Sequence, residues 1–429
     1  MRKMKDSGIE WIGEIPEDWE VRKLKTLTSI SEKKGIYNKN EIYIGLENID
    51  SWTGKYIETT EKVEIESNIT LFDSNSVLFG KLRPYLAKVL KPHQSGQCST
   101  EILVFTPLNI HRDFLFWNFL NTGFIDEVNS STFGAKMPRA NLEFIGNCKL
   151  PFPSLDNQVR IANFLDEKCA LIDRLIECHQ EVIEKLKAYR QSVISEAVTR
   201  GLAPNAPMKD SGIPWIGKIP EGWKTIKLKY LIKYIESGVS VNAGHNAAKE
   251  NEYGVLKTSC VSKFNFDINE NKSVDFSEMG RTRCPVLKNT IIVSRMNTPE
   301  LVGACGYVEK NYPNIFLPDR LWQVHFKNNT NIKYIWYYLI CKNIRNYYAS
   351  LSTGTSSSMQ NISQEQFEQV IIVLPDTTTQ NKITSYLDSK CQFIDSTITK
   401  KQSLIAKLAE YKKSIIYEYV TGKKEVPAS

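Results

Sequence analysis

The chain opens twice with the same segment. Residues 5–19 read KDSGIEWIGEIPEDW and residues 209–223 read KDSGIPWIGKIPEGW, so that 12 of 15 positions are identical. Internal self-similarity of this kind decides the architecture before any local motif does. The chain is therefore expected to consist of two diverged copies of one unit.

A second pair of matching segments closes each copy. QVRIANFLDEKCALIDRLI, residues 158–176, returns as QNKITSYLDSKCQFIDSTI, residues 380–398. The segments between the opening and closing blocks, roughly 24–149 and 228–372, scarcely align. A retained frame around a divergent filling predicts one scaffold that presents two different surfaces.

Length and composition exclude several classes of protein. The 429 residues exceed what one hydrophobic core usually supports, and 41% of them are hydrophobic, so at least two packed domains are expected. The nine cysteines include no CxxC pair, and the first residues contain no apolar run typical of a signal peptide. We therefore expect a protein of the reducing cytoplasm, without disulfides, structural zinc or membrane insertion. The formal charge of +7 is compatible with a polyanionic partner but too modest to establish one.

Both fillings mix strand and helix patterns. Apolar runs bounded by turn residues predict strands at 41–46, 76–82, 87–91, 101–105, 290–296, 304–310, 321–326 and 369–374. Helices are expected at 112–121 and 332–348. In the second helix, an aromatic run at helical spacing is interpreted as core packing rather than base stacking: Trp336, Tyr337, Tyr338, Tyr347 and Tyr348. The predicted fold class is α+β, with two mixed α/β domains in a pseudo-two-fold internal repeat.

The closing blocks predict a short amphipathic helix followed by a longer one that ends at Gly201 or Gly422. Apolar residues at alternating spacings of four and three mark a seam in each long helix: Ile172, Ile176, Ile183, Leu186 and Val193, and in the second copy Ile394, Ile398, Ile405, Leu408 and Ile415. Basic or polar layers interrupt the seam at corresponding places: His179 and Arg190, Lys401 and Lys412. We interpret the seam as an antiparallel, coiled-coil-like contact between the two helices; the alternative is that each helix lies on the core of its own domain.

These patterns divide the chain into successive parts. The predicted order is a first target-binding domain, a first helical region, a linker, a second target-binding domain, a second helical region and a tail: residues 1–153, 154–201, 202–208, 209–375, 376–424 and 425–429.

Motifs of catalytic sites are present only in incomplete form. GIPWIGKI, residues 212–219, approaches a phosphate-binding loop, but Ile219 stands where a hydroxyl residue would hold magnesium. Asp376 and the later Asp388-Ser389-Lys390 have the spacing of a nuclease motif, but the first copy has Ser154 where an acidic residue is required. The five histidines form no HxxxH or HxH pair. We therefore expect no catalytic residue and no metal in this chain, which points to binding.

Basic and polar side chains at strand ends and in loops are candidates for contacts with nucleic acid. FGKLRPYLAK, residues 79–88, places three basic side chains around a proline turn, within reach of phosphates or guanine edges. VSRMNTPE, residues 293–300, corresponds to it, and the polar loops 130–142 and 352–363 form a second pair. The candidate DNA-binding residues are Lys81, Arg83, Lys88, Lys136, Arg139, Arg281, Arg283, Arg295, Ser356 and Gln360. The alternatives are surface charge that serves solubility and loops that only connect.

The combined pattern resembles the specificity subunits of Type I restriction–modification systems. The resemblance is carried by the repeated WIGEIPEDW and WIGKIPEGW openings, by FGKLRPYL, by the loops that end in a methionine, and by LPFPSLDNQVRIANFLDEKCALIDRLI with its copy. It covers essentially the whole chain, and the order of the parts is more specific than any single motif.

The resemblance implies two target-recognition domains, each of which reads one half of a split, asymmetric DNA sequence, and helices that set the spacing. It also implies a non-catalytic chain that assembles with two modification subunits, which use S-adenosylmethionine to methylate adenine. Two restriction subunits that use ATP and magnesium to translocate and cleave DNA complete the implied complex, whose role is defence against foreign DNA.

Two other functions remain open on the sequence alone. The helices and the weak net charge also suit a coiled-coil adaptor that assembles proteins without reading DNA. A self-sufficient modification enzyme or nuclease is a further alternative, against which the incomplete motifs speak.

Overall fold

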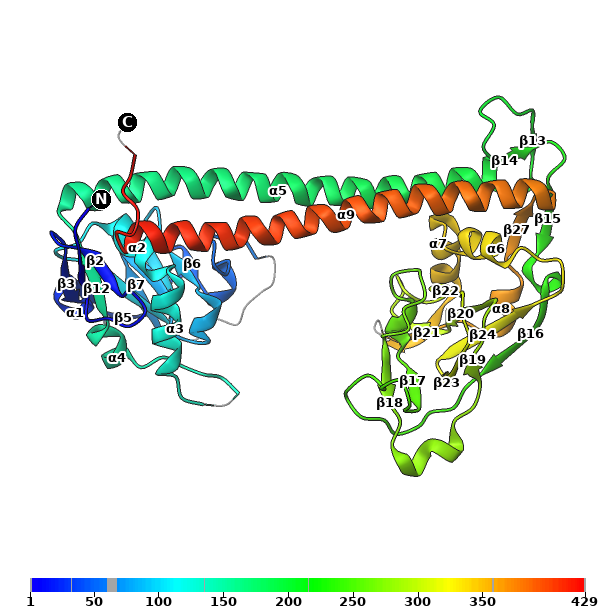
Figure 1. The fold of residues 1–429 in the computed structure, drawn as a ribbon, viewed down its shortest axis with the longest axis horizontal. Coiled ribbons are helices and arrows are strands. Elements are labelled where there is room, and N and C mark those ends of the chain that lie inside the picture. Colours follow the sequence, from blue (N-terminus) through cyan, green and yellow to red (C-terminus); the bar gives the residue numbers. More distant parts are fainter. Residues whose placement is uncertain are drawn as a thin grey trace. The chain divides into compact units, whose positions relative to one another are not determined.

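The computed structural model describes residues 2–31, 33–59, 68–134, 136–214, 216–356 and 359–427. The chain forms two compact units, unit 1 (Met1–Glu181 and Lys401–Ser429) and unit 2 (Val182–Lys400). The boundary between them falls inside both long helices, α5 (Leu155–Arg200) and α9 (Thr377–Val420) (Figure 1). Unit 1 is therefore built from two separate stretches of chain and unit 2 from one, and each unit includes parts of both helices.

Unit 1 contains two four-stranded sheets, ordered β4-β11-β8-β9 and β5-β7-β10-β6, and two-stranded pairs β1-β2 and β12-β3. Helices α2 and α3 cover the first sheet, where the rings of Phe79, Phe105, Phe119 and Phe124 pack edge to face or stacked. The elements that precede α5 are β1 Met4–Asp6, β2 Glu14–Pro16, β3 Glu20–Lys23, α1 Leu24–Leu27, β4 Thr28–Ile30, β5 Lys34–Ile36, β6 Tyr43–Ile44, η1 Leu46–Asn48, β7 Asn68–Phe72, β8 Val77–Gly80, η2 Pro84–Leu86, β9 Val89–Leu90, β10 Gly96–Ser99, β11 Ile102–Pro107, α2 Arg112–Phe119, α3 Thr122–Ser130, α4 Leu142–Asn147 and β12 Lys149–Phe152.

Unit 2 repeats this plan with sheets ordered β16-β24-β20-β22 and β18-β17-β23-β19, the pairs β13-β14 and β15-β27, and an added three-stranded sheet β21-β26-β25. Its elements between α5 and α9 are β13 Met208–Asp210, β14 Lys218–Pro220, β15 Lys224–Lys227, η3 Leu228–Tyr230, β16 Ile232–Ser237, β17 Gly254–Leu256, η4 Thr258–Val261, β18 Asn271–Ser273, η5 Phe276–Arg281, β19 Pro285–Val286, β20 Thr290–Ser294, β21 Met296–Asn297, β22 Cys305–Val308, β23 Tyr312–Phe316, β24 Leu321–Phe326, α6 Ile332–Leu339, α7 Lys342–Leu351, β25 Thr353–Ser356, β26 Met359–Asn361, α8 Gln364–Glu368 and β27 Ile371–Leu374.

The α+β fold class with two mixed units and long helices is confirmed, but two details of the helices are corrected. The single helix expected at 332–348 is two helices, α6 and α7, because Cys341 leaves the helical conformation at ψ 147. The break lets Ile344 and Tyr348 return to the core, where both are buried, and Trp336, Tyr337 and Tyr338 are buried as well. The short and long helices expected in each closing block are one continuous helix of 46 residues in α5 and 44 in α9, since neither range contains a proline or glycine to interrupt it.

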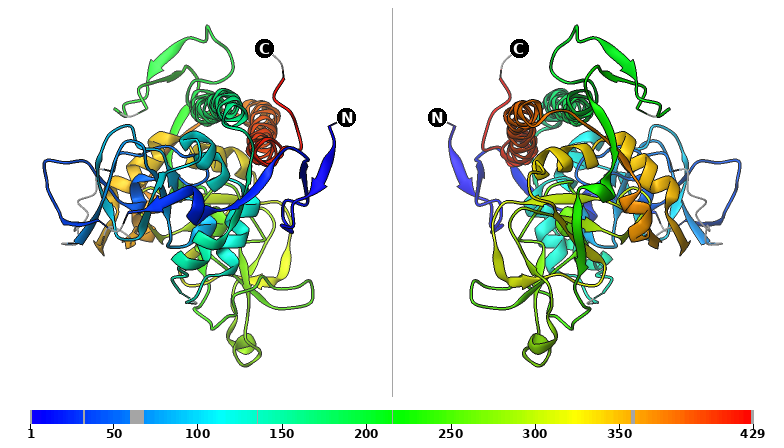
Figure 2. Two further views of the ribbon diagram at one scale, coloured as in Figure 1. Left: turned by 90° about the vertical axis from the view of Figure 1, so that its left-hand side faces the viewer. Right: turned by 90° about the vertical axis from the view of Figure 1, so that its right-hand side faces the viewer.

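Within each unit, one half of α5 lies beside one half of α9 (Figures 1 and 2). In unit 1, Phe164 packs on Tyr419 with ring centroids 4.4 Å apart, and Asp173 accepts a hydrogen bond of 2.8 Å from Lys412. Because residue numbers rise along one helix as they fall along the other, the helices are antiparallel. In unit 2, Arg190 pairs with Asp395 at 3.2 Å.

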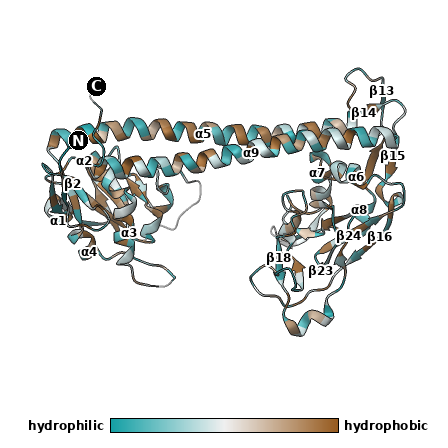
Figure 3. Ribbon diagram, in the orientation of Figure 1, coloured by the Kyte–Doolittle hydropathy of each residue, from teal (hydrophilic) through white to brown (hydrophobic). Residues whose placement is uncertain are grey.

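All ten predicted seam residues are buried or half-buried, and apolar and polar residues alternate along both helices (Figure 3). Ile172 and Ile415 belong to the same cluster as the domain core of unit 1. Both interpretations of the seam therefore apply in this unit, because the helices pack on each other and also on the core of the domain. Coiled-coil interdigitation stays a prediction. Both helices end before a glycine with left-handed backbone, Gly201 (φ 79) and Gly422 (φ 72), as predicted.

Candidate nucleic-acid interface

An aspartate on each long helix holds the domain that carries the candidate site. Asp166 of α5 accepts hydrogen bonds of 2.9 Å from Trp117 of α2 and from Lys91. At the corresponding place in α9, Asp388 accepts 2.7 Å from Tyr337 of α6 and pairs with Lys333 at 3.0 Å. Burial, together with the bond to Asp388, raises the pKa of Tyr337, which therefore stays a neutral donor. The domain that carries the candidate segments is thus fixed to its helix in each unit.

In unit 1 the two predicted candidate segments meet. Arg83 N–H donates to Pro138 O at 2.7 Å, and Ala140 N–H donates to Lys81 O at 2.9 Å. Arg139 completes the junction through β-bridges to Leu82 and to residue 133. We call these joined segments, the described residues 81–85, 131–134 and 136–140, the unit 1 platform.

Unit 2 builds its platform in the same way. Ile362 N–H donates to Arg295 O at 3.1 Å, and β21 pairs with β26 so that Met296 faces Asn361 and Asn297 faces Gln360. The described residues 295–297, 353–356 and 359–362 form this unit 2 platform. Among the residues that the structure describes, its β25 and β26 strands have no counterpart in unit 1, where isolated bridges form instead.

The two platforms correspond residue by residue through their backbone bonds. Lys81 N–H donates to Glu101 O just before β11, and Arg295 N–H donates to Arg320 O just before β24. The carbonyls of the same two residues accept from Ala140 and from its counterpart in unit 2. Lys81 therefore matches Arg295, Glu101 matches Arg320, and Arg139 matches Asn361.

Four of the predicted residues of the first copy lie on the unit 1 platform. Arg83 and Lys136 are exposed, and Lys81 is half-buried. Arg83 adopts left-handed backbone with φ 51, a conformation that costs a residue with a side chain roughly 1–2 kcal/mol and that the bond to Pro138 helps to hold. Arg139 forms a fork-shaped ion pair with Glu101, and this hydrogen-bonded partner raises the pKa of Arg139.

Lys88 lies apart from the platform. Its ammonium donates to the carbonyls of Leu46 and Ile49, inside the η1 turn, and burial lowers its pKa despite nearby Asp50 and Glu47. These bonds favour a structural role for Lys88, and its predicted contact with DNA stays a prediction.

The predicted residues of unit 2 divide into two groups. Arg295 and Gln360 lie on the platform, where the guanidinium of Arg295 donates to Asp319 O at 2.9 Å. The side chain of Ser356, in the same loop, lies outside the described residues. Arg281 and Arg283 lie at the end of η5, where Arg281 pairs with Glu278 at 2.7 Å. The sequence did not separate these groups. All these arginines precede or follow a predicted strand, but the sequence does not show which distant loop packs beside each of them.

The platform of unit 1 also holds residues that sequence reasoning missed. Tyr85, Phe133 and Met137 expose 45%, 64% and 51% of their surface. Exposed apolar side chains that form a patch mark a contact surface more often than single exposed apolar side chains do. A signal was available, because Met137 recurs as Met359 in the repeat, and Met359 is exposed as well.

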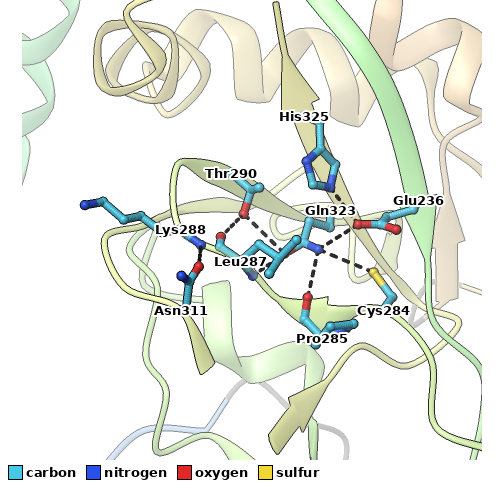
Figure 4. Close-up of polar contacts among 9 residues, drawn as sticks. All are labelled: Glu236, Cys284, Pro285, Leu287, Lys288, Thr290, Asn311, Gln323 and His325. Atoms are coloured by element: carbon cyan, nitrogen blue, oxygen red, sulfur yellow. Dashed lines mark hydrogen bonds and ion pairs between the residues drawn. The ribbon is translucent and has the colours of Figure 1, made fainter. Parts of the chain in front are cut away.

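A buried polar network joins the two large sheets of unit 2 (Figure 4). Gln323 of β24 is fully buried and donates to Glu236 at 2.9 Å and to Pro285 O at 3.0 Å, while it accepts from Leu287 N–H at 2.9 Å. His325 also contacts Glu236, at 2.6 Å. The network fixes β19 and the second sheet to the sheet that leads into the platform.

The described residues contain neither a helix long and apolar enough to span a membrane nor a group of three His, Cys, Asp or Glu residues suited to a metal ion.

The duplicated frame, the paired helices and the two loop platforms together define a protein with two related recognition modules. The model of the Type I restriction modification DNA specificity domain matches residues 16–188 and again 220–408. The chain belongs to this family.

Similar proteins and a solved structure match this chain over most of its length. The chain is 22% identical to the Type I restriction enzyme EcoEI specificity subunit of Escherichia coli, over 91% of this chain and 80% of that protein. It is 24% identical to the MjaVIII specificity subunit of Methanocaldococcus jannaschii, over 95% and 93%. A chain from a solved structure on complex assembly and conformational transition of the type I R-M system shares its fold, with a TM-score of 0.71 at 17% identity over 96% of this chain and 99% of that chain.

Proposed function

We propose that the chain is the DNA sequence-recognition subunit of a Type I restriction–modification complex. Each unit reads one half of a bipartite, asymmetric target through its platform, and the helices α5 and α9 set the spacing and dock two methyltransferase subunits. One observation carries the proposal. Equivalent positions of the two platforms make the same backbone pairings but hold different side chains, as Arg139 and Asn361 do. Such an arrangement suits two readers of different sequences.

The chemistry of the complex belongs to partner chains in this proposal. Modification subunits supply S-adenosylmethionine and methylate adenine, and two restriction subunits supply ATP- and magnesium-dependent translocation and cleavage. The chain itself contributes recognition without catalysis, in the cytoplasm where these partners work. The exposed cations of the unit 1 platform, Arg83 and Lys136, would hold phosphates and fix the register of the duplex.

A selection from random duplexes, with the assembled methyltransferase complex, tests this function. We expect two conserved blocks separated by a gap of fixed length. A salt titration on the selected duplex should give a log–log slope near −0.9 for each phosphate neutralised. One contiguous block would contradict the two-reader proposal. A DNA affinity that depends neither on the salt concentration nor on the sequence would favour a protein-assembly adaptor.

A further inference from the structure

The guanidinium of Arg139 is held by one edge only. Its Nε and Nη2 atoms donate to the carboxylate of Glu101 at 3.0 and 3.1 Å, and Nη1 makes no hydrogen bond to any residue that the structure describes. The side chain of Arg139 exposes 41% of its surface and that of Glu101 exposes 25%. The ion pair therefore lies at the platform surface, with one edge of the fork turned to its partner.

A guanidinium has five N–H donors in a rigid plane. Glu101 uses the Nε–H and one hydrogen of Nη2, which leaves the second Nη2–H and one Nη1–H as parallel donors on the terminal edge of the guanidinium. Two parallel donors on one edge match the O6 and N7 acceptors of guanine in the major groove, the commonest specific contact of arginine with DNA. A guanidinium locked by a carboxylate also loses less side-chain freedom when it binds.

From this geometry we propose that Arg139 reads one guanine of the half-site bound by unit 1, and that Glu101 is the residue that positions it. The proposal rests on the DNA-recognition function proposed above and deepens it. The surroundings agree, because Arg83 and Lys136 supply exposed cations for the flanking phosphates and Phe133 and Met137 supply exposed apolar surface beside the bases.

The same contact cannot occur in unit 2. Asn361 stands where unit 1 has Arg139, and Arg320 stands where unit 1 has Glu101. The guanine preference assigned to Arg139 is therefore a property of one half-site only, which gives the test an internal control.

The test repeats the duplex selection with the assembled complex and three variants. Arg139→Ala should abolish the preference for one guanine in one block, by roughly tenfold to a hundredfold, and leave the other block unchanged. Glu101→Gln should weaken the same preference by a smaller factor. A charge-exchanged double variant, Glu101→Arg with Arg139→Glu, can re-form the ion pair and its stability but lacks an arginine at position 139, so the guanine preference should stay lost.

Thermal unfolding of each complex separates folding from reading, and exchange of the exposed Arg2–Asp18 pair of the same unit is the matched control that should leave both blocks intact. If the double exchange restores the wild-type preference, or if Arg139→Ala weakens both blocks equally, Arg139 is a structural or phosphate-binding residue and the proposal is wrong. A wild-type selection without two blocks would instead contradict the proposed function itself.

Discussion

Units 1 and 2 join their two large sheets in chemically opposite ways. Val104 of β11 pairs with Leu78 of β8, and Gln323 of β24 pairs with Ile292 of β20 at the corresponding point. Val104 belongs to an apolar cluster that reaches both sheets of unit 1, whereas Gln323 is the centre of the hydrogen-bond network of unit 2. The repeat has thus retained the backbone while the chemistry of the junction has changed.

The helices show the reverse relation, in which the chemistry is retained and its environment differs. The pair Asp173–Lys412 in unit 1 corresponds to Asp395–Arg190 in unit 2, with acid and base on exchanged helices. Lys412 and Asp173 expose 7% and 14% of their side chains, but Asp395 exposes 54%. Identical positions in the repeat therefore carry ion pairs of unequal importance, because water screens the exposed pair.

The largest difference between the units is expected when the basic partner of each ion pair is removed. Lys412→Met leaves Asp173 largely buried, with the more distant Lys55, 3.8 Å away, as its remaining basic partner among the described residues, and should lower the free energy of unfolding of unit 1 by about 3 kcal/mol. Arg190→Met leaves a solvated carboxylate at Asp395 and should cost unit 2 about 1 kcal/mol or less. Urea unfolding followed by hydrogen exchange of peptides from each unit measures both values. Equal costs would show that burial does not distinguish the pairs.

An exchange at the sheet junction should have an intermediate effect. Gln323→Val introduces the side chain found in unit 1 but leaves Pro285 O and Leu287 N–H without this side-chain partner. Glu236 also loses the hydrogen bond from Gln323 and keeps its contact with His325. Buried groups that lose a partner destabilise a fold, so unit 2 should lose about 2 kcal/mol. The same hydrogen-exchange measurement on β24 peptides checks this value.

The matched control for that exchange is Gln323→Glu, which keeps the volume and an acceptor but cannot donate to Glu236. It should destabilise unit 2 at least as much as Gln323→Val. If valine proves neutral, the network contributes nothing beyond what the apolar junction of unit 1 achieves.

The sequence predicted the frame well because the repeat supplies its own alignment. The matching blocks 158–176 and 380–398 recur at one offset, and the seam residues were found by their alternating spacings of four and three, which both copies repeat. Residues that contact each other only through tertiary packing could not be found in this way. Glu101 lies 38 positions from Arg139, and Glu236 lies 87 from Gln323, with no periodicity to connect them. The inward turn of Lys88 was missed for the same reason.

The smallest expected effect concerns pH, to which the polar sheet junction of unit 2 should respond and the apolar junction of unit 1 should not. Burial of Glu236 acts to raise its pKa, but hydrogen bonds from Gln323 and His325 outweigh this effect and leave the pKa below the ordinary value of 4.5. A carboxylate whose pKa is lower in the folded state stabilises the fold above the unfolded pKa, and this stability is lost as the pH falls through the folded value. Unit 2 should therefore lose stability below about pH 4.5, by roughly one or two degrees in Tm because the group is partly solvated.

Glu236→Gln should remove this part of the pH dependence in unit 2 without altering unit 1, where Ser31 occupies the corresponding place beside Val104 and cannot titrate in this range. Melting curves of the wild type and the variant, resolved by unit through hydrogen exchange and recorded from about pH 6 to about pH 3.5, compare the two slopes. Parallel slopes in unit 2 would mean that Glu236 is equally acidic in the unfolded chain, and that the polar junction differs from its apolar counterpart in packing rather than in electrostatics.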